Sequence, residues 1–119
     1  MEETTQDQLI QTAMRILTSA GDARNDAKQA RAAMREMRFE KARELMLLAK
    51  QNITEAHTAQ TEIIQNEARG IKYEYCMLFN HAQDTLMTIN SEIELTQDII
   101  DTFQVLCEKL EKKAGCVHE

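Results

Sequence analysis

Proline is absent from this sequence of 119 residues, and glycine and aromatic residues are scarce, with three glycines, two tyrosines and three phenylalanines. Because tight turns depend on glycine and proline, and strands are enriched in aromatic residues, this composition leaves little material for sheets. The abundant residues are alanine, glutamate, glutamine, methionine and leucine, which favour helices. The composition predicts one all-α domain, long enough to bury a core.

The sequence also lacks a long apolar run and an excess of basic residues. Its longest apolar run, Leu45–Ala49, is far shorter than the roughly 20 residues of a transmembrane helix. No apolar stretch follows the acidic start Met1-Glu2-Glu3, so we expect no signal peptide. The formal charge of −6 argues against a general nucleic-acid binder, which carries a basic patch. We therefore expect a cytoplasmic protein without direct membrane insertion.

Cysteine usage gives no sign of a disulfide framework or a metal site. Cys76, Cys107 and Cys116 are odd in number and lack the paired spacing of metal ligands. Free thiols in a reducing compartment are the natural interpretation.

Apolar periodicity predicts three long helices, over residues 6–34, 39–68 and 75–112, followed by a flexible tail over 113–119. Short connections make neighbouring helices antiparallel. The expected fold is an up-down-up three-helix bundle.

Local signals mark the ends of these helices. Thr5 and Gln8 form the expected capping box of the first helix. Gly70 suits the left-handed position after the second helix. Gly21, inside the first helix, indicates close packing or a local break, with a tolerated surface glycine as the alternative.

Two series of side chains run along the third helix at steps of three and four residues. The first is a packing seam of the kind helices use against one another. It comprises Tyr75, Leu78, Ala82, Thr85, Ile89, Ile93, Thr96, Ile100, Phe103, Cys107 and Leu110. The second is mixed in polarity and comprises Met77, His81, Asp84, Thr88 and Leu95. Since a bundle needs about one stripe per helix, the second series predicts a subunit interface.

Asp84 is the unusual member of that second series. Copies of this carboxylate near a symmetry axis would repel one another, so the site would need a cation, protonation or displacement. An ordinary solvated carboxylate is the alternative.

His81 stands three residues before Asp84, so the two share a helix face. A neutral imidazole is a nucleophile toward phosphorus, and a carboxylate can hold a metal ion or orient the ring. Met77 and Leu78 offer an apolar contact patch for a partner, with core positions as the alternative.

Folding the three helices back on one another is expected to bring three segments into one slab of the bundle. These are Gly21–Arg24, Glu55–His57 and His81–Asp84. Within this slab, His57 is expected to be a packed or supporting histidine and not a second nucleophile toward phosphorus.

These segments resemble the enzyme IIA component of the lactose/cellobiose class of the bacterial phosphoenolpyruvate-dependent sugar phosphotransferase system. The resemblance covers roughly Ile16 to Phe103, with the motifs in a matching order. The matching pieces are Ala20-Gly21-Asp22-Ala23-Arg24, Glu55-Ala56-His57 with Gln60-Thr61, and His81-Ala82-Gln83-Asp84 with Leu86-Met87-Thr88.

The resemblance implies a homotrimer of three-helix subunits with the third helices about the axis. It implies that His81 is the phosphoacceptor, receiving phosphate from phospho-HPr and passing it to a cysteine of enzyme IIB. The membrane permease, enzyme IIC, is then only an indirect partner. Asp84 is implied to bind Mg²⁺ or another divalent cation at the axis, one carboxylate per subunit.

The chain departs from this family at one position near the acceptor. Members commonly carry a second histidine directly after the aspartate, where this chain has Thr85. A threonine hydroxyl donates a hydrogen bond but carries no positive charge, so stability or transfer of the phosphohistidine is expected to differ. Gln83 and Thr85 are the expected neighbours of the imidazole.

Two alternatives differ in class. One is a non-catalytic helical trimer that binds partners without carrying phosphate. The other, a carboxylate-bridged metal enzyme, is disfavoured because neither His57 nor His81 has a glutamate three residues earlier. The sugar is not specified by this sequence.

Overall fold

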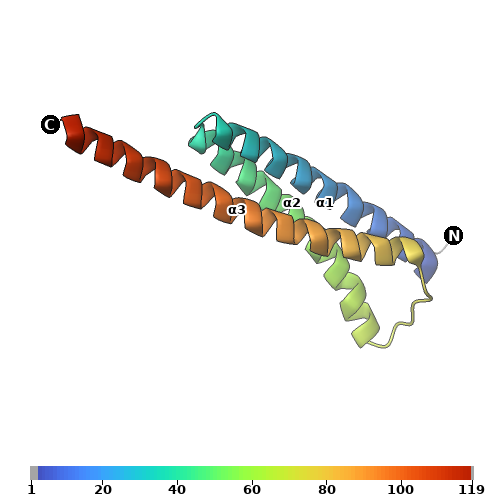
Figure 1. Cartoon of the computed structure of the whole chain (residues 1–119). Helices are drawn as coiled ribbons and strands as arrows, with labels where there is room; N and C mark the ends of the chain where they lie inside the picture. Colours follow the sequence, from blue (N-terminus) through green and yellow to red (C-terminus); the bar gives the residue numbers. More distant parts are fainter. Residues whose placement is uncertain (1–2, 119) are drawn as a thin grey trace.

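Three helices make up the computed structural model, which describes residues 3–118. They are α1 (Thr5–Arg35), α2 (Phe39–Ala68) and α3 (Met77–His118). The molecule measures 75 × 23 × 18 Å, and α3 runs beside α1 and past the α1–α2 turn (Figure 1). The predicted all-α, up-down-up architecture is confirmed.

α3 is longer than the sequence analysis predicted. It begins at Met77 and continues to His118, so residues 113–118, expected to form a flexible tail, are helical. No proline interrupts this stretch, and Lys113 and Ala114 favour a helix.

The core is built unequally by the helices. α1 contributes mostly alanines, whose small side chains allow the backbones to approach closely, whereas α3 contributes larger aliphatic groups. The buried alanines of α1 are Ala13, Ala20, Ala23, Ala27, Ala30 and Ala33. The largest buried side chains of α3 are Leu86, Ile89 and Ile100.

The predicted seam of α3 is confirmed in its middle and wrong at its ends. Tyr75 is 75% exposed because it precedes the helix, and Leu110 is 58% exposed because it lies beyond the start of α2. Phe39 of α2 packs against Phe103 with ring centroids 5.8 Å apart. Cys76, Phe79 and Leu86 are buried, although the predicted seam omitted them.

The N-terminus of α1 is capped one residue earlier than expected. The hydroxyl of Thr4 accepts a hydrogen bond from the Asp7 N–H (3.0 Å), and the Asp7 carboxylate accepts one from the Thr4 N–H (3.3 Å). The pair Thr5 and Gln8 is therefore not the capping box. Asp7 also places a negative charge in the first turn, where the helix dipole favours it.

α1 and α2 end in the same Schellman geometry but with different residues at the left-handed position. After α2, Gly70 has φ 100, and the Ile71 N–H bonds to the Asn66 carbonyl at 3.0 Å, as predicted for this glycine. After α1, the left-handed residue is Met37, with φ 63, and the Arg38 N–H bonds to the Ala33 carbonyl at 2.9 Å. A side chain at this φ is strained.

Gly21 neither breaks α1 nor permits a close approach. The helix is continuous through it, and a Cβ built there would meet nothing within 4 Å. The alternative of a tolerated surface glycine is the correct one.

Candidate functional site

His81 lies on the second turn of α3, exposed to solvent. The connection before α3 is anchored by Tyr73, whose hydroxyl donates to Gln8 of α1 at 2.8 Å and accepts from Asn66 of α2 at 3.0 Å. These bonds tie the start of α3 to both other helices. His81 is thus presented by a rigid element whose entry is fixed.

Asp84 shares the exposed face of His81, one turn further along α3. Among the described side chains, no group of three or more His, Cys, Asp or Glu residues comes together as a metal site. A single chain therefore supplies one carboxylate at this position. Its oxygen donors suit a hard cation such as Mg²⁺, but a complete ligand set would require other copies of the chain.

Gln83 faces α2 and not the exposed face of α3. Its side-chain oxygen accepts a hydrogen bond of 3.0 Å from the amide of Gln60, which is buried on α2. This bond links the second and third sequence motifs. The role of Gln83 beside the His81 imidazole stays a prediction, as does that of Thr85, which is half-buried one turn beyond His81.

His57 belongs to a different surface. It is exposed, and its Nδ1 lies 3.4 Å from the Thr61 hydroxyl, one turn away on α2. The shallow hollow beside it is formed by α2 alone, with lining residues His57, Thr58, Thr61, Glu62 and Gln65. In the single chain this hollow is separate from the exposed face of His81.

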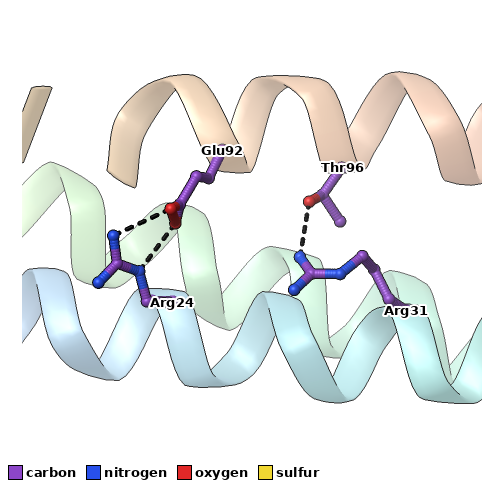
Figure 2. Close-up of polar contacts among 4 residues, drawn as sticks. All are labelled: Arg24, Arg31, Glu92 and Thr96. Atoms are coloured by element: carbon purple, nitrogen blue, oxygen red, sulfur yellow. Dashed lines mark hydrogen bonds and ion pairs between the residues drawn. The ribbon is translucent and has the colours of Figure 1, made fainter. Parts of the chain in front are cut away.

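The first motif contacts α3 further along than expected. Arg24 forms a bidentate ion pair with Glu92, with distances of 2.8 and 2.9 Å, and Arg31 donates to the Thr96 hydroxyl at 2.9 Å (Figure 2). Glu92 lies about two turns beyond Asp84. The three motifs therefore occupy neighbouring levels of the bundle and not one slab, because α1 and α3 are offset along their common direction.

Glu92 is a polar contact that the sequence analysis missed. Its hydrogen bonds to the Arg24 guanidinium lower the pKa of the carboxyl, while partial burial opposes the shift. The same bonds raise the pKa of Arg24. The sequence held one signal for this contact. Glu92 follows Thr85 of the predicted seam by seven residues, or two turns, which places its carboxylate beside the seam.

Two apolar side chains lie one turn before His81 on α3. Met77 is 72% exposed, whereas Leu78 is half-buried and packs against the core. Of the two alternatives weighed for these residues, Leu78 is therefore a core position and Met77 is not. A contact role for Met77 stays a prediction.

Comparison with known proteins identifies the family. The profile of "PTS system, Lactose/Cellobiose specific IIA subunit" matches residues 11–104. The chain belongs to the lactose/cellobiose-specific enzyme IIA family. Enzyme IIA proteins are components of the phosphotransferase system for sugar transport, and this chain is such a phosphotransferase component.

Relatives of this enzyme IIA carry names that specify different sugars. It is 37% identical to the lactose-specific EIIA component of Lacticaseibacillus casei over 92% of this chain and 96% of the relative. It is 34% identical to the lichenan-specific enzyme IIA component of Bacillus subtilis over 87% and 94%. The crystal structure of the cellobiose-specific enzyme IIA from Bacillus anthracis superposes with a TM-score of 0.80 at 38% identity, over 91% and 96%.

Enzyme IIA proteins in general work with the carrier HPr and with an enzyme IIB. Within residues 3–118, no helix of this enzyme IIA is long and apolar enough to span a bilayer.

Proposed function

We propose that this enzyme IIA is a cytoplasmic phosphohistidine carrier in which His81 accepts a phosphoryl group from phospho-HPr and passes it to a cysteine of enzyme IIB. The observation that carries this proposal is the exposed His81 on a helix whose entry is fixed, within the residues that match the family profile. An acceptor that serves two partners in turn must be reachable by both. Phosphoryl transfer needs positioning and an in-line approach more than covalent assistance.

In the first step a lone pair on an imidazole nitrogen of His81 attacks phosphorus. The new N–P bond forms as the N–P bond of the donor phosphohistidine breaks, and that electron pair returns to the donor imidazole. In the second step the thiolate of enzyme IIB forms an S–P bond while the N–P bond of His81 breaks. The transferred group then reaches a lactose- or cellobiose-type sugar at the permease.

The proposed assembly is a homotrimer with α3 of each subunit about the axis. It is supported by the exposed face of α3, which carries Met77, Asp84 and Leu95 and packs against nothing described in the chain's own bundle. Asp84 from each subunit would hold a divalent cation, Mg²⁺ by donor chemistry, and the cation would offset the repulsion among the carboxylates. The phosphoryl steps above use His81 alone.

The test is incubation of the full chain with enzyme I, HPr and phosphoenolpyruvate, followed by measurement of intact mass. We expect a gain of one acid-labile phosphate that is retained in His57→Ala and absent from His81→Ala. Subsequent addition of the cognate enzyme IIB should remove it. Absence of phosphate while HPr is fully charged would favour a partner-binding trimer without phosphotransfer.

Thr85 is expected to set the rate of this transfer. It follows His81 by one turn and replaces the second histidine common in the family, so the site lacks one group that can carry positive charge. For Thr85→His we expect unchanged assembly and an altered rate of transfer to enzyme IIB, measured in a single turnover with Thr85→Ser as the control. Equal rates in the wild type and both variants would mean that Thr85 in place of the histidine has no effect on transfer.

A further inference from the structure

The start of α3 lacks the local support with which α1 begins. Cys76 occupies the N-cap position, because its carbonyl accepts the first helical hydrogen bond from the Asn80 N–H at 3.1 Å. Cysteine is not among the residues whose side-chain oxygen caps a helix. The first turn of α3 also carries no acidic residue for the helix dipole, whereas α1 has Asp7. Contacts with the other helices must therefore set where α3 begins along the bundle, and with it the position of His81.

Four side chains supply such contacts through consecutive hydrogen bonds. The Arg69 guanidinium donates to the side-chain oxygen of Asn66 at 3.3 Å, and the Asn66 amide donates to the Tyr73 hydroxyl at 3.0 Å. The hydroxyl in turn donates to the side-chain oxygen of Gln8 at 2.8 Å. Because each acceptor group donates onward in the same direction, every bond polarises the next one and strengthens it.

Tyr73 is the central member of this series and lies in the connection between α2 and α3. That connection carries the chain from the end of α2 back to the first turns of α1 (Figure 1). The Tyr73 hydroxyl is bound to α1 through Gln8 and to α2 through Asn66, and its ring packs against the core. Its backbone stands three residues before Cys76. A single hydroxyl thus relates the start of α3 to both other helices.

We propose that Tyr73 is a positioning residue for phosphoryl transfer at His81. This inference rests on the proposed carrier function and deepens it. A partner protein that reaches His81 also meets α1, which runs beside α3 (Figure 1). The approach of the imidazole to the phosphorus of a docked partner therefore depends on where α3 begins along α1. In-line transfer depends on positioning, and a displacement of about 1 Å can slow it by a large factor.

Removal of the hydroxyl should disturb this placement more than the fold. In Tyr73→Phe the ring keeps its packing, and the half-buried Gln8 and Asn66 can bond to water instead. Cys76 and Phe79, which are 8% and 7% exposed, still hold the first turn of α3 against the core. Such apolar contacts are non-directional and specify a position less sharply than hydrogen bonds do. The folded protein should persist with a less defined position of His81.

The test is single-turnover phosphorylation of the full chain by an excess of phospho-HPr, with the amplitude and the rate constant measured separately. The amplitude reports how much of the protein is folded, and the rate constant at saturating phospho-HPr reports the placement of the imidazole. For Tyr73→Phe we expect a rate constant about three- to tenfold lower, with the amplitude and the half-saturating concentration unchanged. Tyr75→Phe is the matched control, because Tyr75 lies in the same connection and is 75% exposed, and it should behave as the wild type.

A double-mutant cycle tests whether the effect passes through the bond to α1. Gln8→Met removes the acceptor at nearly constant side-chain length and should slow transfer by a factor similar to that of Tyr73→Phe. The two substitutions together should be no slower than Tyr73→Phe alone, because both remove the same link. Slowing that multiplies in the double variant would overturn the action of Tyr73 through Gln8.

Two further outcomes would overturn the positioning role and leave the carrier function standing. One is an unchanged rate constant in Tyr73→Phe. The other is a reduced amplitude at an unchanged rate constant, which a purely structural role of the hydroxyl predicts. A wild type that gains no phosphate from fully charged HPr is a distinct result, because it would overturn the carrier function itself.

Discussion

The two halves of α3 use the same helix for opposite purposes. In the first half, residues 77–94, the inner face is buried against α1 and α2, and the outer face is mixed in polarity, with His81 and Asp84 exposed beside Met77. In the second half, which begins at residue 95, the last described contact with the bundle is that of Cys107 with Met37, and the outer face over residues 95–110 is largely apolar. The well-packed first half holds His81 in a fixed position. The second half is less well packed and leaves an apolar surface free for association.

Substitutions in the two halves should differ most in their effect on the free energy of unfolding of the subunit. Ile89 is fully buried in the first half, so Ile89→Ala should lower the free energy of unfolding by about 2–5 kcal/mol through lost burial and a residual cavity. Leu110→Ala in the second half should cost less than about 0.5 kcal/mol in dilute solution. Urea unfolding of both variants checks this. Equal losses would mean that the projecting stretch packs against its own bundle.

A substitution that makes the first half resemble the second is Asp84→Leu. We expect the proposed trimer to persist without divalent cation and to dissociate at about tenfold lower concentration, because the carboxylates proposed to cluster at its axis are replaced by apolar contact. The measurement is sedimentation with and without a chelator, and Glu94→Leu, also exposed on α3, is the control. Dissociation of Asp84→Leu into monomers would place Asp84 away from the axis.

Near the boundary between the halves, the Arg24–Glu92 pair ties α3 to α1. Both side chains are partly exposed, 49% and 41%, so Arg24→Ala should cost only about 0.5–1 kcal/mol at neutral pH. Because the pKa of Glu92 is lowered in the folded protein, this contribution is present above the ordinary carboxyl range and is lost as pH falls through the lowered pKa. Wild type and variant should therefore converge on acidification.

Unfolding of both proteins across pH checks this, with Arg15→Ala, an exposed arginine of the same helix, as the control. A stability gap that stays constant at acid pH would mean that Arg24 acts through packing and not through the Glu92 carboxylate.

Small effects of opposite sign should come from the turns that adjoin each half. Met37, whose sulfur lies 3.8 Å from the Cys107 sulfur of the second half, has a left-handed backbone, so Met37→Gly should raise the free energy of unfolding by about 0.5 kcal/mol. Gly70, which precedes the first half, has a positive φ that glycine adopts without strain. Gly70→Ala should therefore lower the free energy of unfolding by about 1 kcal/mol. Thermal unfolding of the two variants should therefore shift in opposite directions.

The sequence predicted what depends on local spacing and missed what depends on the relative placement of helices. Long apolar periodicity located α2 at both ends, and the three-residue spacing placed His81 and Asp84 on one face. The bonds Gln60–Gln83 and Arg24–Glu92 were not predicted. Both bonds depend on the offset between helices, which is set by the connection before Met77. This offset produces no periodic pattern in the sequence from which it could be predicted.

The length of α3 also separates the proposed phosphoacceptor from the far end of the helix in a way that is useful in practice. His81 and His118 lie on one continuous helix, roughly 55 Å apart along its axis. A fluorophore, purification tag or surface anchor fused after the last residue would therefore sit far from any protein docked at His81. The same rod would hold several such attachments close together wherever the chains associate in parallel, which makes the terminus a natural point for reporting assembly without disturbing transfer.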